Sequence, residues 1–395
     1  MARLQRKAVK LGLEKILDEH IHFLKGMRVG LVCNPASVNH QFQHAADLFY
    51  ENEQINLTTL FGPQHGIRGD VQDNMIETSH IVDSQTEIPI YSLYSETREP
   101  TEEMLSSIDA LVFDLQDVGC RVYTFIYTMA NCLRACARYG KKMFVLDRPN
   151  PINGIDIEGN LLEAGHESFV GMYPIPMRHG LTVGELAKLF NTDFELHCDL
   201  EVITMDNWRR EDFYDETDAP WVMPSPNMPT VDTSVVFPAT VYLEGTQVSE
   251  GRGTTRPFET IGASYINALE LADALTSLKL SGVIFRPINF LPTFQKFANK
   301  NCGGVFLHIS DREIFEPVIA GLMIIKTIFD LYPNEFKWKN PPYEYVYDRN
   351  PFDVIAGTTK IREFFEQGKT IKEVKNSWQR DIQEFSKTRE KHLLY

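Results

Sequence analysis

The segment 244–259 is rich in side chains that can bind or activate a ligand. It reads Glu-Gly-Thr-Gln-Val-Ser-Glu-Gly-Arg-Gly-Thr-Thr-Arg-Pro-Phe-Glu, with three carboxylates, two arginines and three glycines. Glycines let the backbone approach a ligand closely, and the guanidinium groups of Arg252 and Arg256 suit a carboxylate or phosphate. Because no helical or strand period runs through it, we expect a functional loop with Glu250 as an acid/base candidate. A solvated connecting loop is the alternative.

A second polar motif, Gly-Pro-Gln-His-Gly-Ile-Arg-Gly, occupies residues 62–69. It places Gln64, His65 and Arg68 between closely spaced glycines. This pattern predicts a substrate-binding turn with a polar group at position 64. A glycine turn that merely exposes a histidine is the alternative.

Asp114 and Asp117 follow a very apolar run, Leu111–Phe113. A carboxylate at the end of a buried strand is partly desolvated, which raises its pKa and suits acid/base work. Arg121 and Tyr123 would then face the same crevice. Alternatively, either aspartate could cap the helix expected over 123–139 or bind backbone amides.

Two further loops carry candidates for ligand binding. The proline loop 147–154, Asp-Arg-Pro-Asn-Pro-Ile-Asn-Gly, contributes Asn150, whose amide can both donate to and accept from sugar hydroxyls. Arg178 and His179 precede a helix expected to begin at Thr182, a favourable position for an anion. Rigid turn chemistry and a surface basic pair, respectively, are the alternatives.

These motifs follow short apolar runs that alternate with helical patterns. The runs are 29–32, 57–61, 90–93, 111–113 and 143–146. Such alternation predicts an α/β fold, a Rossmann-like parallel sheet with helices on both faces, whose strand-end loops converge on one crevice. After a Trp/Pro/Asp-rich stretch the pattern changes to β–α–β–β–α. We therefore expect a catalytic domain over 1–235 and a smaller α+β domain over 236–395 that completes the cleft.

The composition narrows the class of protein. A net charge of −15 argues against nucleic-acid binding, and no stretch approaches the length of a membrane span. The chain has neither a G-x-G-x-x-G after its first strand nor a Walker A motif, and its six cysteines are scattered. We expect no cofactor and no metal. The N-terminus lacks the pattern of a signal peptide, so a cytoplasmic location is expected. The oligomeric state is not predicted.

Several motifs together resemble the NamZ family of exo-acting β-N-acetylmuramidases. They are "LFGPQHGIRGD", "LVFDLQDVGCRVYTFIYTM", "VLDRPNPING", "SFVGMYPIPMRHGLTVGELA", "SPNMPT", which contains Asn227, and "LEGTQVSEGRGTTRPFE". The resemblance covers roughly residues 28–370. It implies a Rossmann-like catalytic domain joined to a smaller domain with the active site between them. It also implies release of N-acetylmuramic acid from the non-reducing end of peptidoglycan fragments. The lack of a signal-peptide pattern favours recycling of such wall fragments inside the cell.

The chain departs from the family pattern at one position. Many members carry Pro-Glu-His-Gly where this sequence reads Pro-Gln-His-Gly, and the glutamate has been proposed as catalytic. Gln64 can serve neither as an acid nor as a base.

The sequence leaves several roles open. Glycoside cleavage needs a proton donor, and a 2-acetamido sugar can supply its own nucleophile. Glu250 or Asp117 could be the acid, with Asp114 or Gln64 orienting the acetamide or a water. Arg252, Arg256, Arg178 and Arg68 are the candidates for holding the lactyl carboxylate of the sugar. Two other functions fit the motifs: a non-catalytic muropeptide- or sugar-binding protein, and a hydrolase of another anionic metabolite.

Overall fold

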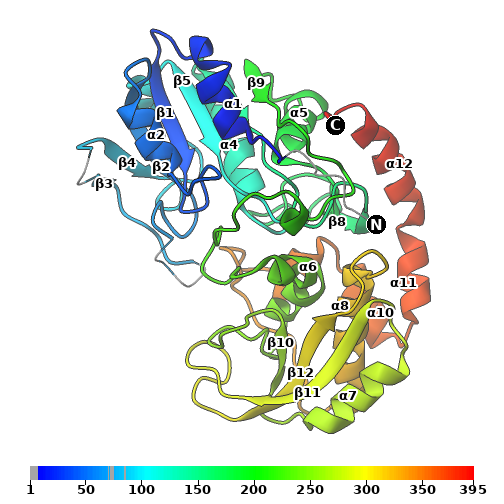
Figure 1. Cartoon of the computed structure of the whole chain (residues 1–395). Coiled ribbons are helices and arrows are strands. Elements are labelled where there is room, and N and C mark those ends of the chain that lie inside the picture. The colour runs from blue at the N-terminus through cyan, green and yellow to red at the C-terminus, as the bar shows by residue number, and fades with distance from the viewer. Residues whose placement is uncertain (1–7, 70, 72–74, 84–85) are drawn as a thin grey trace, which may run out of the picture.

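The computed structural model describes residues 8–69, 71, 75–83 and 86–395. Figure 1 shows two halves, one built on a large sheet and one on a smaller sheet. The strands are β1 (Arg28–Cys33), β2 (Asn56–Gly62), β3 (Ile81–Val82), β4 (Pro89–Ser92), β5 (Ala110–Asp114), β6 (Lys142–Leu146), β7 (Glu158–Leu161), β8 (Pro176–Arg178), β9 (Leu200–Ile203), β10 (Thr260–Ala263), β11 (Val283–Phe290) and β12 (Cys302–Ile309).

Helices connect and cover these strands. They are α1 (Gly12–Asp18), α2 (Ala45–Glu51), α3 (Glu102–Ser106), α4 (Phe125–Arg138), α5 (Val183–Asp193), α6 (Val231–Thr240), α7 (Ala268–Ser277), α8 (Pro317–Leu331), α9 (Pro351–Ala356), α10 (Lys360–Glu366), α11 (Ile371–Ser377) and α12 (Gln379–Glu390), with short 3-10 turns η1 (Ile21–Phe23), η2 (Tyr214–Glu216) and η3 (Val241–Gly245).

The large sheet has seven strands in the order β3-β4-β2-β1-β5-β6-β9. Neighbouring strands are parallel, except that the edge strand β3 runs antiparallel to β4. The expected parallel sheet is confirmed. Because β2, β1, β5 and β6 point the same way, the loops that follow them lie at one edge of the sheet.

Alternate residues of the central strands build separate apolar layers on the two faces. Leu31 and Val112 pack in the layer that contains α1 and α2, whereas Val32 and Phe113 pack in the layer that contains α4 and α5. Side chains alternate across a strand, so near-continuous apolar runs are buried on both faces. The expectation of helices on both faces is confirmed.

Helix α5 begins directly after Thr182, as expected, and a reciprocal pair of hydrogen bonds caps it. The Thr182 hydroxyl accepts a hydrogen bond from Glu185 N at 3.2 Å, and the Glu185 carboxylate accepts one from Thr182 N at 3.0 Å. This reciprocal pair satisfies two backbone donors at the helix start. The capping pair therefore fixes the start of α5, and with it the end of the segment that contains Arg178 and His179.

The second half contains the antiparallel sheet β10-β12-β11. Helix α7 packs against β11 and β12, and α8 lies against α6 and α7. The order β10–α7–β11–β12–α8 confirms the predicted β–α–β–β–α pattern. None of the helices among the described residues combines the length and apolar character needed to cross a membrane.

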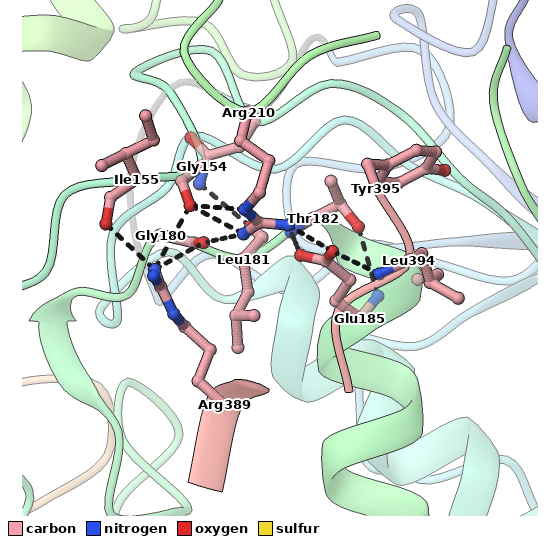
Figure 2. A network of polar contacts seen from close by, with 12 residues as sticks. Gly154, Ile155, Gly180, Leu181, Thr182, Glu185, Arg210, Arg389, Leu394 and Tyr395 are labelled. Carbon is pink, nitrogen blue, oxygen red and sulfur yellow. Dashed lines mark hydrogen bonds and ion pairs between the residues drawn. The ribbon is translucent and has the colours of Figure 1, made fainter. Parts of the chain in front are cut away.

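The C-terminal helices return to the first half, which the sequence pattern did not predict. In Figure 1, α11 and α12 run along one side of the molecule, and the C-terminus lies near α5. Figure 2 shows how this segment is held: Arg389 donates to the carbonyls of Gly154, Ile155 and Gly180, and Leu394 N donates to Glu185 Oε1 at 2.9 Å. The returning segment thereby ties the two halves together.

Candidate active site

A pocket lies where the strand-end loops of the large sheet meet the second half. Its polar lining comes from both: Gln64, His65, Tyr123, Thr124, Ser225, Asn227, Glu244, Arg252, Tyr343 and Glu344. Its apolar lining includes Phe125, Phe237 and Phe258. Phe237 packs edge-on against Phe258, with ring centroids 4.8 Å apart. The pocket therefore offers hydrogen-bonding groups beside flat apolar surfaces, a combination that suits a sugar carrying an acetamido group.

The turn after β2 places Gln64 in the pocket. Gly66 N donates to Pro63 O at 2.9 Å, and His65 adopts a positive φ of 71°. The Gln64 amide is held at both ends, because its oxygen accepts from Thr124 Oγ1 at 2.6 Å and its nitrogen donates to Glu344 Oε1 at 3.3 Å. This arrangement fixes which end of the amide faces Glu344.

Glu344 sits at the centre of a tight turn between α8 and α9. Tyr343 and Val346 exchange backbone hydrogen bonds of 3.1 and 2.9 Å, and the two residues between them, Glu344 and Tyr345, have φ values of 44° and 64°. Such turns favour glycine or asparagine, so two larger residues here store conformational strain of about 1–3 kcal/mol each. Strain of this kind is typical of functional sites. Here the turn directs the Glu344 carboxyl group into the pocket.

Neutral partners surround the Glu344 carboxyl group. Oε2 accepts a hydrogen bond from Tyr94 OH at 2.8 Å, and Oε1 accepts the one from Gln64. Burial raises the pKa of Glu344, and the hydrogen bonds from Tyr94 and Gln64 offset only part of that increase. Glu344 is only 3% exposed. A raised pKa lets a carboxyl group keep its proton to a higher pH than an ordinary glutamic acid does, which suits a proton donor.

A second carboxyl group, Glu244, has the opposite environment. Oε1 accepts from Arg252 Nη2 at 2.6 Å, and Oε2 accepts from Tyr343 OH at 2.6 Å. Burial alone would raise the pKa of Glu244, but the Arg252 charge and the Tyr343 hydrogen bond outweigh it and hold that pKa below its ordinary value. Two neighbouring carboxyl groups are thus driven to different protonation states, the arrangement that assigns acid and base roles in many enzymes.

Comparison with known proteins places the chain in a family. Residues 29–232 match the N-terminal model, and residues 235–395 the C-terminal model, of the family described as exo-β-N-acetylmuramidase NamZ. The chain belongs to the NamZ family. It is 48% identical over 391 residues to the peptidoglycan β-N-acetylmuramidase NamZ of Bacillus subtilis strain 168, covering 99% of this chain and 92% of that protein.

Solved structures of Bacteroides fragilis proteins share the fold. One crystal structure of a DUF1343 family protein is 37% identical, has a TM-score of 0.89, and covers 99% of this chain and 100% of that one. A second DUF1343 family protein is 31% identical, has a TM-score of 0.77, and covers 98% of this chain and 99% of that one. The NamZ fold therefore extends over nearly the whole chain.

The pocket contains several of the residues expected from sequence to act in a NamZ site. They are Gln64, His65, Tyr123, Asn227 and Arg252. Glu250 lies in an adjoining chamber, where Oε2 pairs with Lys296 Nζ at 2.7 Å and Oε1 lies 3.4 Å from Arg252 Nε. Both Glu250 oxygens are therefore occupied by cations, which removes the geometric basis for its expected role as the acid.

Asp114 and Asp117 do not line the pocket. Both oxygens of the fully buried Asp114 bind Arg148, at 2.5 and 2.8 Å. Asp117 Oδ2 accepts from Gly119 N at 2.7 Å and lies 3.2 Å from His179 Nε2. Their contacts hold the strand-end loops in place, and neither is positioned for the acid or orienting role expected of it.

Other expected ligand-binding residues instead bind the protein's own backbone. Arg121 is fully buried and donates to the carbonyls of Asn160, Ile175, Ile355 and Ala356. Asn150 donates to Leu181 O at 2.9 Å, and Arg178 bonds to Ile152 O and pairs with Asp156 at 3.0 Å. His179 is buried beside Asp117. Sequence shows these residue types at strand ends but not that they turn back onto the chain.

The two most exposed of the expected arginines also lie outside the pocket. Arg68 pairs with Asp83 at 3.0 Å, and Arg256 pairs with Glu259. Of the arginines expected to hold the substrate carboxylate, Arg252 lines the pocket, and it is already bonded to Glu244.

Sequence reasoning missed Glu344, together with Tyr94 and Thr124, which hold Glu344 and Gln64. The available signal was weak: Pro-Pro-Tyr-Glu-Tyr at 341–345 is an acid among aromatic side chains in a segment without periodicity. Its importance depends on a turn that brings it to Gln64, 280 positions away.

Proposed function

We propose that this protein hydrolyses the β-glycosidic bond of N-acetylmuramic acid at the non-reducing end of peptidoglycan fragments, with Glu344 as the proton donor. Family membership supports the reaction. One observation supports the assignment of the acid: Glu344 is a buried pocket carboxyl group whose hydrogen-bond partners are the neutral side chains of Tyr94 and Gln64. Its raised pKa keeps the proton available for the departing oxygen.

The pocket favours a nucleophile supplied by the substrate. A protein nucleophile or general base would be a second carboxylate in the pocket. Glu244 is held in an ion pair with Arg252, and the Arg252 charge helps to hold its pKa below the ordinary value, which makes it a weak base. The 2-acetamido carbonyl of the sugar can take that role, as it does in substrate-assisted glycosidases.

The proposed steps balance without a cofactor. Glu344 transfers its proton to the glycosidic oxygen as the bond from that oxygen to C1 breaks, and the acetamido oxygen bonds to C1. Water then attacks C1 as the bond from C1 to the acetamido oxygen breaks, and it gives a proton to the Glu344 carboxylate, which restores both the acetamide and the acid. The same side chain thus acts first as acid and then as base.

Gln64 is a positioning residue in this scheme. Its amide connects the Thr124 hydroxyl to the Glu344 carboxyl group. Gln64, the residue that departs from the family pattern, therefore contacts the proposed acid Glu344 directly. The ionisable carboxyl group at this contact is that of Glu344.

The test is release of free sugar from a disaccharide of N-acetylmuramic acid β-linked to N-acetylglucosamine. The wild type should release N-acetylmuramic acid, and Glu344→Gln should be slower by roughly 10²–10⁴-fold at unchanged melting temperature. Glu313→Gln, an equivalent change at an exposed loop residue, serves as the control. Binding without release by the wild type would support a sugar-binding protein instead, and full activity of Glu344→Gln would refute the assignment of the acid.

A cytoplasmic location and a role in recycling wall fragments remain predictions. Fractionation of cells expressing the full-length protein, followed by detection of it beside cytoplasmic and exported marker proteins, would test the location.

A further inference from the structure

A charged chamber adjoins the pocket on the far side of Tyr343. The two cavities share Glu244, Arg252, Tyr343 and Glu344 as lining residues. The chamber adds Glu250, Lys296 and Lys339. The chamber therefore lies directly beside the Glu344 carboxyl group, within the reach of a substituent on a sugar bound there.

Two of the three cations in this chamber are already bound. Lys296 Nζ donates to Leu243 O at 2.8 Å, Val248 O at 3.0 Å and Glu250 Oε2 at 2.7 Å, which uses all three of its ammonium hydrogens. Arg252 is paired with Glu244 and Glu250. Neither cation has its charge available for a ligand.

Lys339 differs from both. Its backbone N donates to Gly245 O at 2.9 Å, which anchors it beside η3, and its ammonium lies 5.6 Å from the centre of the Tyr343 ring. It forms no ion pair with a carboxylate of residues 8–69, 71, 75–83 or 86–395. Lys339 is therefore the cation of this chamber whose charge is not used by an ion pair within the described residues.

We propose that Lys339 binds the lactyl carboxylate of the substrate and so distinguishes N-acetylmuramic acid from N-acetylglucosamine. This inference rests on the proposed function. The two sugars differ by the lactyl ether on the oxygen of C3, which carries one negative charge. One uncompensated cation in a chamber beside the acid matches that charge, and a charge-assisted hydrogen bond in a partly buried site is a strong source of discrimination. Lys339 is thus a specificity-determining residue. Arg68 and Arg256, the exposed arginines expected from the sequence to hold this carboxylate, do not line the chamber.

The test compares the full-length wild type with Lys339→Met, which keeps an unbranched side chain one atom shorter and removes its charge. Affinity for free N-acetylmuramic acid and for free N-acetylglucosamine is measured by calorimetry, and kcat/KM on an aryl β-N-acetylmuramide is measured beside it. Lys339→Met should lose about 10- to 100-fold in affinity for N-acetylmuramic acid, with little change for N-acetylglucosamine. The loss in kcat/KM should appear mainly in KM. Lys339→Arg should recover part of both losses.

The control and the contrary outcomes separate this inference from the proposed function. Lys337→Met removes an exposed charge two positions away and should behave as wild type. Unchanged affinity of Lys339→Met for N-acetylmuramic acid, or equal losses for both sugars, would overturn the role of Lys339. If the wild type binds N-acetylmuramic acid through Lys339 but releases no sugar, the proposed reaction fails while the recognition stands.

Discussion

Removing the hydroxyl group of Tyr94 should make the proposed acid weaker. Tyr94 OH donates to Glu344 Oε2 at 2.8 Å, and this hydrogen bond lowers the pKa of Glu344 against the effect of burial. A hydrogen bond to a charged group contributes about 1.5–3 kcal/mol. Each tenfold change in proton affinity corresponds to about 1.4 kcal/mol, so Tyr94→Phe should move the basic limb of the pH profile upward by about 1 pH unit or more.

The assay is kcat/KM on the disaccharide of N-acetylmuramic acid β-linked to N-acetylglucosamine as a function of pH, because its sugar leaving group needs the proton of Glu344 and this parameter reports ionisation of the free enzyme. Tyr91→Phe is the matched control: Tyr91 packs against Phe61 on the neighbouring strand β2 and does not line the pocket. A basic limb that stays in place or moves downward in a folded Tyr94→Phe variant would refute the claim that the Tyr94 hydrogen bond lowers the pKa of Glu344.

Two further variants test the electrostatics of the fold. Gln64→Glu would place a second carboxyl group against Glu344, where Gln64 Nε2 now donates at 3.3 Å. The two carboxyl groups should share a proton, which moves the basic limb of the kcat/KM profile upward. An unmoved profile would contradict the contact between residues 64 and 344. Burial raises the pKa of Asp147 from 3.8 to about 7. The contribution of Asp147 to the free energy of unfolding is therefore present below about pH 4 and is lost as the pH rises through about 7. The loss is at most ~4 kcal/mol. Asp147→Asn should therefore flatten the fall in unfolding free energy over this range in denaturant titrations, even if the variant is less stable at every pH, and an unaltered slope would contradict the assignment.

The sequence was sufficient to predict the layered architecture of the first half. Short apolar runs predicted β1, β2, β4, β5 and β6 because strands buried on both faces need apolar residues at nearly every position. The capping box at Thr182 depends only on residues three apart, so it was also predictable. The short edge strand β3 and the returning helix α12 were not, because their positions depend on tertiary contacts.

The active site was predictable only in part, for a related reason. Residue type and strand-end position identified Gln64 and Arg252, which line the pocket. The same criteria also selected Asp114 and Arg121, whose polar atoms bind Arg148 and backbone carbonyls, respectively. Glu344 escaped notice because its orientation comes from a strained turn and its raised pKa comes from burial by distant segments.

The central claim is that Glu344 donates the proton to the leaving group, and leaving-group dependence tests it most directly. Wild type and Glu344→Gln should be compared on a β-N-acetylmuramide with a nitrophenyl leaving group, which needs little protonation, and on the disaccharide, whose sugar leaving group needs a proton. We predict that kcat/KM of Glu344→Gln, which reports the steps through cleavage of the glycosidic bond, stays within about tenfold of wild type on the aryl glycoside but falls roughly 10²–10⁴-fold on the disaccharide. Equal losses on both substrates, or no loss on the disaccharide, would contradict the claim.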